Sequence, residues 1–366
     1  MCTSLVYKDA AGKAYFGRTM ELTVVLPYQL ALLPKGAQCS SRIEGHPEVV
    51  YQRQHDIIAI TMPDRMPTAV DQIKPEELKV IEGLNDVGLT FSLLAYPDSA
   101  GTQSSEMTRA VLAASDLGAW ILGSFATVAE VRAAIEKQPV LLEPMKVLGG
   151  TVSPFHYVAH DPSGAGLVIE FHKGVMHLFD NPVGVMTNGP VFDWHLTNLG
   201  NYTFLSNVDR SSATFGSLQV RQPDSGIATA GLPSSNTSVG RFVRAVYYTQ
   251  FAEKAASPDA AVLTLSHVMN NFDRPRGVTI DLPGEDACGI EVEGLGDNDL
   301  PYQTEFTCWT IMSDLDRRQF YVRDYSGLNF ISIDLASLSG LDAPRVISLD
   351  RLTSKAGDVT DALRAA

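Results

Sequence analysis

The chain has 366 residues, of which 45% are hydrophobic and 19% are charged, a composition typical of a globular protein with a large buried core. Its formal net charge is −14 at neutral pH, and no basic block offsets this acidic excess. We therefore expect no nucleic-acid partner and no anionic membrane surface. An anionic substrate would have to be received by local arginines.

The start of the chain has no run of lysines followed by an apolar stretch, and no window approaches about 18 uninterrupted apolar residues. We therefore expect neither a secretory signal nor a membrane span. The four cysteines, Cys2, Cys39, Cys288 and Cys308, form no CxxC pair and no metal-ligand spacing. This usage is typical of free thiols in a reducing compartment, so we expect a cytoplasmic protein without a metal.

The first predicted elements are strands, and helices follow them. In chain order we expect a hairpin formed by strands over 3–8 and 13–18, a buried strand over 88–96, and helices over 106–121 and 128–137. Thr127 and Glu130 have the spacing of a capping box at the start of the second helix.

Strands return in the middle and at the end of the chain. We expect strands HYVAHD, GLVIEFH, GVMHLFD and GVMTN within 155–187, a long loop over 200–237, helices over 239–255 and 259–271, and strands EFTCWTIMS, QFYVRDY and NFISIDL. This order favours sheets packed between helical layers over alternating βαβ units. No GxGxxG motif follows a strand, which disfavours a dinucleotide-binding domain.

Cys2 stands directly after Met1, at the start of the predicted hairpin. Methionine aminopeptidase removes Met1 readily when the next residue is small, and Cys2 would then carry both a thiol and a free α-amine. In model compounds such an amine titrates near about 8 and a thiol near about 8.5, so the amine can accept the thiol proton. One residue would then supply nucleophile and general base. The alternative is an incidental cysteine at a frayed end.

Five stretches along the chain carry a family resemblance. They are the opening MCTSLVY…YFGRTME, NPVGVMTNGPVFDWHLTNLGNY (181–202), SVGRFVR (238–244), NNFDRPRG (270–277) and TCWTIMSDLDRRQFYVRDY (307–325). Together and in this order they resemble the choloylglycine hydrolase family, which comprises the bile salt hydrolases and penicillin V acylases. The resemblance spans nearly the whole chain.

The resemblance implies an α+β fold of four layers, αββα, in a single N-terminal-nucleophile hydrolase domain over 2–366 once Met1 is removed. It implies cleavage of a linear amide, a small-molecule acyl amide, by way of a thioester and without a cofactor or metal. The loop at 200–237 is about as long as the family's assembly loop, so the resemblance also implies a homo-oligomer, a homotetramer.

The resemblance assigns roles to four residues. Cys2 would be the nucleophile and its amine the base. Arg18, in FGR, would lie beside the thiol and stabilise the thiolate, and Asn188, in MTN, would donate its side-chain amide to the developing oxyanion. Arg241 would complete the electrostatics of the site. Without the family, Arg18 would be a surface hairpin residue, Asn188 a turn residue and Arg241 a solvated helix-start residue.

Two positions depart from the family pattern. Glu21 stands where the family usually has an aspartate that holds the N-terminal amine, so the charge is kept on a side chain one methylene longer. Ala95 stands where bile salt hydrolases tend to carry asparagine and penicillin V acylases tyrosine. A main-chain N–H of Ala95 can still complete an oxyanion hole, but the side chain's part in substrate choice is lost.

The substrate remains open within the family. Conjugated bile salts are expected because they are the family's commonest substrates, and penicillin V and N-acyl homoserine lactones are the alternatives. Loops after the first hairpin would form an apolar acyl pocket, with Met20 and Leu26 as its expected lining. Two other classes are a glutamine amidotransferase, for which no second domain is left, and a catalytically silent family member that binds or assembles.

Other candidate sites are weaker. His156 and His160 in HYVAH are spaced for a metal only on a helix, and the segment is predicted to be a strand, so we interpret them as core or surface histidines. Cys39, Cys288 and Cys308 are expected to be buried or inert thiols. Four acidic residues within 291–299 are interrupted by glycine and are expected to form a solvated loop, with a calcium site as the less favoured alternative.

Overall fold

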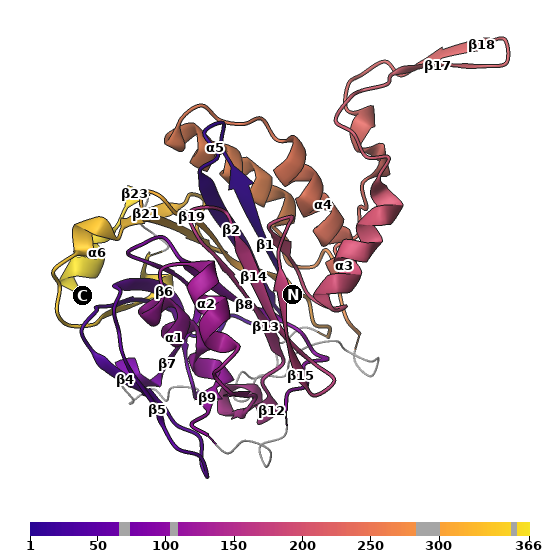
Figure 1. Cartoon of the computed structure of the whole chain (residues 1–366). Helices are drawn as coiled ribbons and strands as arrows, with labels where there is room; N and C mark the ends of the chain where they lie inside the picture. Colours follow the sequence, from indigo (N-terminus) through magenta and orange to yellow (C-terminus); the bar gives the residue numbers. More distant parts are fainter. Residues whose placement is uncertain (66–73, 103–108, 283–300, 353–356) are drawn as a thin grey trace.

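The computed structural model describes residues 1–65, 74–102, 109–282, 301–352 and 357–366. Two large β-sheets lie face to face, and a pair of α-helices covers the outer face of each (Figure 1). The predicted α+β fold with four αββα layers is confirmed. The Cys288 thiol and the acidic segment 291–299 lie outside the described residues.

A seven-stranded sheet combines the N-terminal hairpin with the last strands of the chain. Its strands in spatial order are β16 (Val185–Met186), β1 (Cys2–Lys8), β2 (Ala14–Leu22), β19 (Phe306–Asp314), β20 (Gln319–Asp324), β21 (Ile331–Asp334) and β23 (Gly357–Asp358). The central strands β2 and β19 are buried along their whole length, because helices cover one face and the second sheet covers the other.

An eight-stranded antiparallel sheet forms the second layer. Its strands in spatial order are β15 (Val175–Asp180), β14 (Gly166–His172), β13 (Phe155–His160), β8 (Thr90–Ala95), β7 (Leu78–Asn85), β6 (Ile57–Pro63), β3 (Gln29–Leu33) and β22 (Arg345–Ser348). The predicted elements omitted β3, β6 and β7. Their apolar runs lack an alternating pattern because both faces are buried.

Short strands and turns complete the β structure. The paired short strands are β4 (Gln38–Ser41) with β5 (Val49–Gln52), β9 (Leu112–Ala113) with β10 (Val140–Leu141), β11 (Pro144–Met145) with β12 (Thr151–Val152), and β17 (Ser212–Phe215) with β18 (Leu218–Arg221). Single 3₁₀ turns are Pro75–Glu77, Ala114–Asp116, Lys146–Leu148, Leu199–Tyr202, Ile227–Gly231, Asn270–Phe272, Ala336–Leu338 and Leu349–Leu352.

The helices occupy the two outer layers. Those packed on the large sheets are α1 (Leu117–Ser124) on β7 and β8, α2 (Val128–Ile135) on β14, α4 (Ser238–Phe251) on β1, and α5 (Pro258–Met269) on β2 and β19. Two short helices, α3 (Phe192–Asn198) and α6 (Thr360–Ala365), lie at the margins. The predicted capping box is confirmed, because Glu130 N donates to Thr127 Oγ1 at 3.2 Å and Thr127 N to Glu130 Oε2 at 3.3 Å.

The helix predicted over 106–121 is wrong in its first half. Residues 103–108 lie outside the described residues, Leu112–Ala113 form strand β9, and α1 begins only at Leu117. The carboxylate of Glu143 accepts the backbone N–H groups of Ala114 and Ser115 at 3.0 and 3.2 Å. Glu143 is distant in sequence from these two residues. Its carboxylate binds backbone N–H groups that the predicted longer helix would have used for its own hydrogen bonds.

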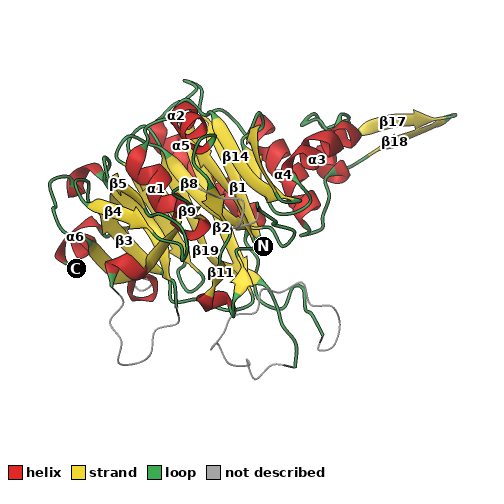
Figure 2. Cartoon of the chain, turned by 60° about the horizontal axis from the view of Figure 1, so that its bottom comes forward, coloured by secondary structure: helices red, strands yellow, loops and turns green. Residues whose placement is uncertain are grey.

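The segment 200–237, predicted to be a loop, contains the hairpin β17–β18, which projects from the layered body (Figures 1 and 2). Gly216 makes its turn with φ of +61°, a conformation that favours glycine. Every residue of the two strands is exposed. Phe215 and Leu218 are 69% and 61% exposed, so the hairpin presents apolar surface to its surroundings.

The register of the first hairpin determines which side chains meet. Cys2 pairs with Met20 and Ser4 pairs with Arg18 across β1 and β2. Side chains two residues apart point to the same face of a strand, so Cys2, Arg18 and Met20 share one face. Arg18 contacts β7 and β8, which places this face in the interface between the two sheets.

We expect Gly→Ala substitutions at two positions of α1 to have different effects on stability. A Cβ at Gly118 would lie 2.7 Å from the Phe91 ring and 2.8 Å from the Val80 carbonyl oxygen, so we expect Gly118→Ala to cost about 1–3 kcal/mol through overpacking. At Gly123 the nearest atom is Cγ of the flexible Arg53 at 3.2 Å, so Gly123→Ala is expected to be neutral or stabilising. Urea unfolding of both variants checks this; equal effects would contradict it.

Candidate active site

Cys2 begins strand β1 and is 2% exposed, at the interface between the two sheets. Its Sγ lies 3.4 Å from Nη2 of Arg18 and 3.5 Å from Sδ of Met20. The same Nη2 lies 3.3 Å from Sδ of Met20. The thiol therefore has a fixed cation beside it, which is the surrounding that favours a thiolate.

Arg18 is fully buried, and the opposing sheet holds its guanidinium. Nη1 donates to Ile81 O at 3.0 Å and lies 3.3 Å from Oε2 of Glu82, and Nη2 donates to Leu93 O. The guanidinium carbon lies 4.8 Å from the ring centroid of Trp309. These contacts aim the charge at the Cys2 sulfur and leave it little freedom to move.

Two opposing effects act on the charge of Arg18. Burial works to lower its pKa, but the charges of Cys2 and Glu82 outweigh burial and raise it. The guanidinium is therefore charged at any physiological pH. Burial raises the pKa of Glu82 to about 7, against the opposing effects of Arg18 and of the Ser92 hydroxyl, which donates to the carboxylate at 2.5 Å.

Asn188 lies just after β16 and joins three parts of the chain. Its Oδ1 accepts the backbone N–H of Cys2 at 3.0 Å and Nη2 of Arg241 at 2.6 Å. Its Nδ2 donates to Ala95 O at 2.8 Å. These partners settle the orientation of the amide, and since Nδ2 carries two hydrogens, the bond to Ala95 uses one of them.

Arg241 lies in the first turn of α4, which Thr237 caps by accepting Gly240 N at 3.2 Å. The guanidinium is fully buried, and Nη1 donates to the backbone oxygen of Cys2 and to Thr3 Oγ1 at 2.7 Å. Burial lowers the pKa of Arg241 against the attraction of nearby acidic groups. Arg241 is therefore not the solvated helix-start arginine of the alternative interpretation; it holds the backbone of Cys2.

Glu21 is buried beside the start of the chain. Its backbone oxygen accepts the Met1 ammonium at 2.7 Å, and Oε1 of Glu305 lies 3.1 Å from the same ammonium. The Glu21 carboxylate accepts Thr307 Oγ1 at 3.0 Å, and its other oxygen has no partner among the described residues. Burial raises the pKa of Glu21, while Arg241 and the terminal ammonium oppose the rise.

The structure brings most of the predicted site residues together, namely Cys2, Arg18, Met20, Ala95, Asn188 and Arg241. Leu26 is 4% exposed in the segment between β2 and β3, and its place in a substrate pocket stays a prediction. The alternative that put Arg18 on the surface is wrong, because its side chain is fully buried and hydrogen-bonded. Asn188 lies in a bend after β16, as its turn alternative has it, and its side chain is also buried and hydrogen-bonded.

Several neighbours of the site were not predicted. Glu82 anchors Arg18 and Trp309 covers it, although EFTCWTIMS was recognised as a strand. A charged residue within an apolar run, as Glu82 is in LKVIEGLN, is the signal that would have found it, since such a residue is buried only with a partner. His195 was also missed; its Nε2 lies 2.9 Å from the backbone oxygen of Asn188.

The remaining candidate residues make no hydrogen bond to the Cys2 thiol within the described chain. Cys308 is buried, and burial raises its pKa to about 12, as expected for an inert thiol. Cys39 is half-buried, and its inertness stays a prediction. His156 and His160 lie on strand β13, as predicted, and both are buried. Among the described residues no group of three or more His, Cys, Asp or Glu side chains is arranged to hold a metal.

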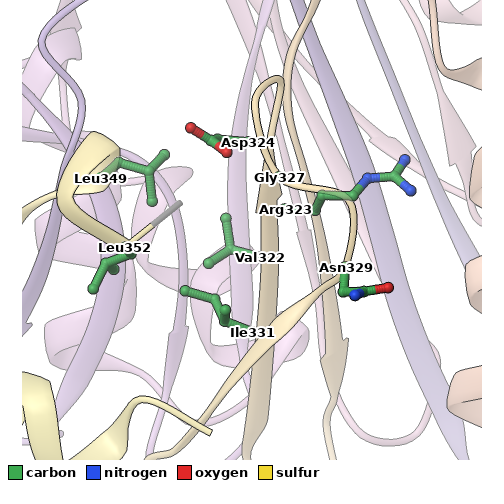
Figure 3. Close-up of a pocket in the computed structure, with 8 residues that line it drawn as sticks. All are labelled: Val322, Arg323, Asp324, Gly327, Asn329, Ile331, Leu349 and Leu352. Atoms are coloured by element: carbon green, nitrogen blue, oxygen red, sulfur yellow. The ribbon is translucent and has the colours of Figure 1, made fainter. Parts of the chain in front are cut away.

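A hollow at the far edge of the seven-stranded sheet is too small for a substrate. Val322, Ile331 and Leu349 face one another there (Figure 3). The free volume is about 10 Å³, room for about one water molecule.

The profile of the family described as "Linear amide C-N hydrolases, choloylglycine hydrolase family" matches residues 2–290. The chain belongs to this family. A bile salt hydrolase/transferase from Lactiplantibacillus plantarum is 25% identical over 351 residues, which are 95% of this chain and 96% of the relative. As a member of this family the chain is an enzyme that hydrolyses linear amide C–N bonds.

Solved structures show the same fold. A mutant conjugated bile acid hydrolase from Clostridium perfringens superposes with a TM-score of 0.77 at 20% identity, over 95% of this chain and 96% of that one. A penicillin V acylase from Agrobacterium tumefaciens gives 0.73 at 19% identity, over 99% and 96%. These likenesses show that this choloylglycine hydrolase family member has the same fold as the two enzymes.

None of the helices in the described part of the chain combines the length and apolar character needed to cross a membrane.

The raised pKa of Glu82 predicts that its contribution to the stability of the folded chain decreases as pH rises. Its value of about 7 lies above the ordinary 4.5, so between these values the folded chain binds more protons than the unfolded chain. The variant Glu82→Gln lacks this titration. We expect the Tm of the wild type minus the Tm of Glu82→Gln to fall between about pH 4.5 and pH 8 in calorimetry. The exposed control Glu136→Gln should give a constant difference, and constancy for Glu82→Gln would refute the prediction.

Proposed function

We propose that this family member uses Cys2 as the nucleophile of a thioester mechanism, with conjugated bile salts as its preferred substrates. The proposal rests on one observation: the thiol of Cys2 lies against Arg18 while its backbone nitrogen lies against Asn188. In the described chain Met1 is attached, so this nitrogen is an amide. Removal of Met1 would turn it into the amine that serves as the base.

The reaction would proceed in two halves. The Cys2 amine takes the thiol proton, and Sγ attacks the substrate carbonyl carbon to form a tetrahedral oxyanion. The second Nδ2 hydrogen of Asn188 and the main-chain N–H of Ala95 would receive this oxyanion. The C–N bond then breaks as the ammonium gives its proton to the leaving nitrogen, and the same amine activates water to hydrolyse the thioester.

The remaining predicted residues would prepare the nucleophile. Arg18 stabilises the thiolate, and Arg241 holds the Cys2 carbonyl and the Asn188 amide. Glu21 would hold the free amine of Cys2 once Met1 has left. The longer glutamate keeps the charge of the family's aspartate, and its side chain already contacts Thr307 on the neighbouring strand.

The substrate class follows from relatives rather than from geometry. The relative from Lactiplantibacillus plantarum, a bile salt hydrolase/transferase, covers nearly the whole chain, which favours a glycine- or taurine-conjugated bile acid. Penicillin V and N-acyl homoserine lactones are the alternative substrates, because Ala95 replaces the side chain that bears on this choice. Met20 beside the thiol supports an apolar acyl pocket, to which Leu26 would add.

A catalytically silent binding homologue is the alternative from a different class. Glu21 and Ala95 favour it, whereas the contacts among Cys2, Arg18, Asn188 and Arg241 favour an enzyme. We further propose one catalytic domain over 2–366, in the cytoplasm and without a cofactor.

Intact mass before and after mixing with glycocholate or penicillin V tests the proposed function. We expect a chain lacking Met1 that releases glycine from glycocholate, with both the turnover and the acyl-enzyme mass lost in Cys2→Ala. Cys39→Ser is the matched control, because Cys39 is half-buried and distant in sequence from the site, and it should keep full activity. Release of the penicillin nucleus instead would preserve the mechanism and change the substrate.

Two results would contradict the proposal. Activity in a preparation that retains Met1 would rule out the amine of Cys2 as the base. Loss of Met1 without turnover of either substrate would leave the silent homologue and the acyl-homoserine lactone acylase as the leading alternatives, and an assay with N-acyl homoserine lactones would separate them.

The projecting hairpin supports a homotetramer. Its exposed apolar side chains, with Phe215 and Leu218 at the tip, are typical of surface that another subunit covers. We expect replacement of 212–221 by a short glycine-serine linker to lower the mass measured by light scattering to that of a dimer or monomer. The double variant Phe215→Ser and Leu218→Ser should act in the same direction. An unchanged mass would contradict the assembly role.

A further inference from the structure

A buried histidine–carboxylate pair lies next to the backbone of Asn188. His156 on β13 and Glu170 on β14 are 1% and 0% exposed, and Nδ1 of the imidazole lies 2.9 Å from Oε1 of the carboxylate. The other ring nitrogen lies 3.0 Å from the backbone oxygen of Thr187, the residue before Asn188. The pair therefore joins the eight-stranded sheet to the chain just after β16 in the other sheet.

These contacts determine which ring nitrogen of His156 donates. A carbonyl oxygen only accepts hydrogen bonds, so Nε2 must carry a hydrogen and donate it to Thr187. Oε1 of Glu170 provides the partner for Nδ1, and Oε2 accepts the backbone N–H of Phe192 at 3.0 Å. Glu170 is thus held at both oxygens, and it keeps the imidazole turned so that Nε2 faces Thr187.

A second imidazole holds the next carbonyl. Nε2 of His195 on α3 lies 2.9 Å from the backbone oxygen of Asn188, and its Nδ1 has no partner among the described residues. Burial lowers the pKa of His195, so the ring is neutral at neutral pH and Nε2 carries its hydrogen. The carbonyls of Thr187 and Asn188 are therefore each bound by a buried imidazole.

The amide side of Asn188 is held as well. Oγ of Ser238, at the start of α4, accepts the backbone N–H of Asn188 at 2.9 Å and lies 2.9 Å from Oγ1 of Thr187. Both peptide groups that flank the Asn188 Cα are bound, so the backbone sets the direction of its Cα–Cβ bond. That direction carries the amide to Cys2 N and Ala95 O.

From this juxtaposition we propose that His156, oriented by Glu170, is a positioning residue for amide hydrolysis: it fixes the Thr187 carbonyl and thereby the Asn188 amide that meets the oxyanion. The inference rests on the proposed function, because Asn188 is assigned its role there. A displacement of about 1 Å in a group that stabilises the transition state costs about 100-fold in rate. His156 itself touches neither the substrate nor the thiol.

His160 provides the comparison within the same strand. It is four residues from His156 on β13 and is 0% exposed, but neither ring nitrogen has a hydrogen-bond partner among the described residues. Burial lowers its pKa to about 3, so it is a neutral core residue. A histidine can therefore be buried in this sheet without hydrogen bonds to a carboxylate and a carbonyl. Burial alone does not explain why His156 has both partners.

The test compares three variants of the processed enzyme. His156→Phe keeps an aromatic ring against Tyr96, whose ring centroid lies 5.0 Å from that of His156, but removes the donor. We expect kcat for glycocholate to fall about 10- to 100-fold, with KM and the rate of Cys2 alkylation by iodoacetamide changed by no more than about threefold. His156→Gln restores an N–H donor and should recover most of the loss. His160→Phe, the matched control, should keep kcat.

Equal effects of His156→Phe and His160→Phe on kcat would overturn the proposal, and so would a loss that appears in KM or in thiol alkylation alone. If His156→Phe does not fold, His195→Phe removes the neighbouring donor to Asn188 and should lower kcat in the same way. Unchanged kcat in that variant would then overturn the proposal.

Crystal structures separate this inference from the proposed function. If the wild type hydrolyses none of the substrates, the proposed function fails, and the position of Asn188 in His156→Phe still tests the inference. We expect the distances from Asn188 to Cys2 N and Ala95 O to lengthen in His156→Phe and to stay unchanged in His160→Phe. An unmoved Asn188 in His156→Phe would overturn the proposal whatever the activity.

Discussion

The guanidinium of Arg18 crosses from one sheet to the other with no access to water, and a buried cation costs several kcal/mol unless hydrogen bonds and an opposite charge compensate it. The carbonyls of Ile81 and Leu93 and the carboxylate of Glu82 supply that compensation from the facing sheet. The two sheets must therefore keep one relative position. That position also puts Nη2 against the Cys2 sulfur, so the packing of the two sheets and the surroundings of the Cys2 thiol depend on the same contacts.

Asn188 couples the remaining parts of the site to this interface. Its side-chain amide contacts the backbone nitrogen of Cys2, the carbonyl of Ala95 at the end of β8 and the guanidinium of Arg241, which come from three regions distant in sequence. Its backbone is held by Ser238 and His195, and through Thr187 by His156. These contacts hold the Asn188 amide in one orientation, and donors that need no reorganisation when charge develops are what the proposed acyl transfer requires.

Local sequence signals predicted the parts of the fold that depend on neighbouring residues. The hairpin before Arg18, the capping box at Thr127 and the helices around Arg241 follow from periodicity, turn residues and caps. The helix before Leu117 was wrong because Glu143, distant in sequence, binds the amides there. Strands β3, β6 and β7 were not predicted, because strands buried on both faces lack the alternation of apolar and polar residues by which strands are recognised.

The sequence by itself determined the family and the candidate site residues, since Cys2 after Met1, FGR and MTN are local motifs that can be read without coordinates. Only the tertiary structure decided that Arg18 and Arg241 are buried and that Glu82 anchors Arg18. It also decided that the ring nitrogens of His156 are hydrogen-bonded, whereas those of His160 have no partner among the described residues. The two histidines lie on the same strand and look alike in HYVAH. Their difference comes from what the opposing segments bring within 3.0 Å, and hydrogen bonds between distant segments have no signature in either segment alone.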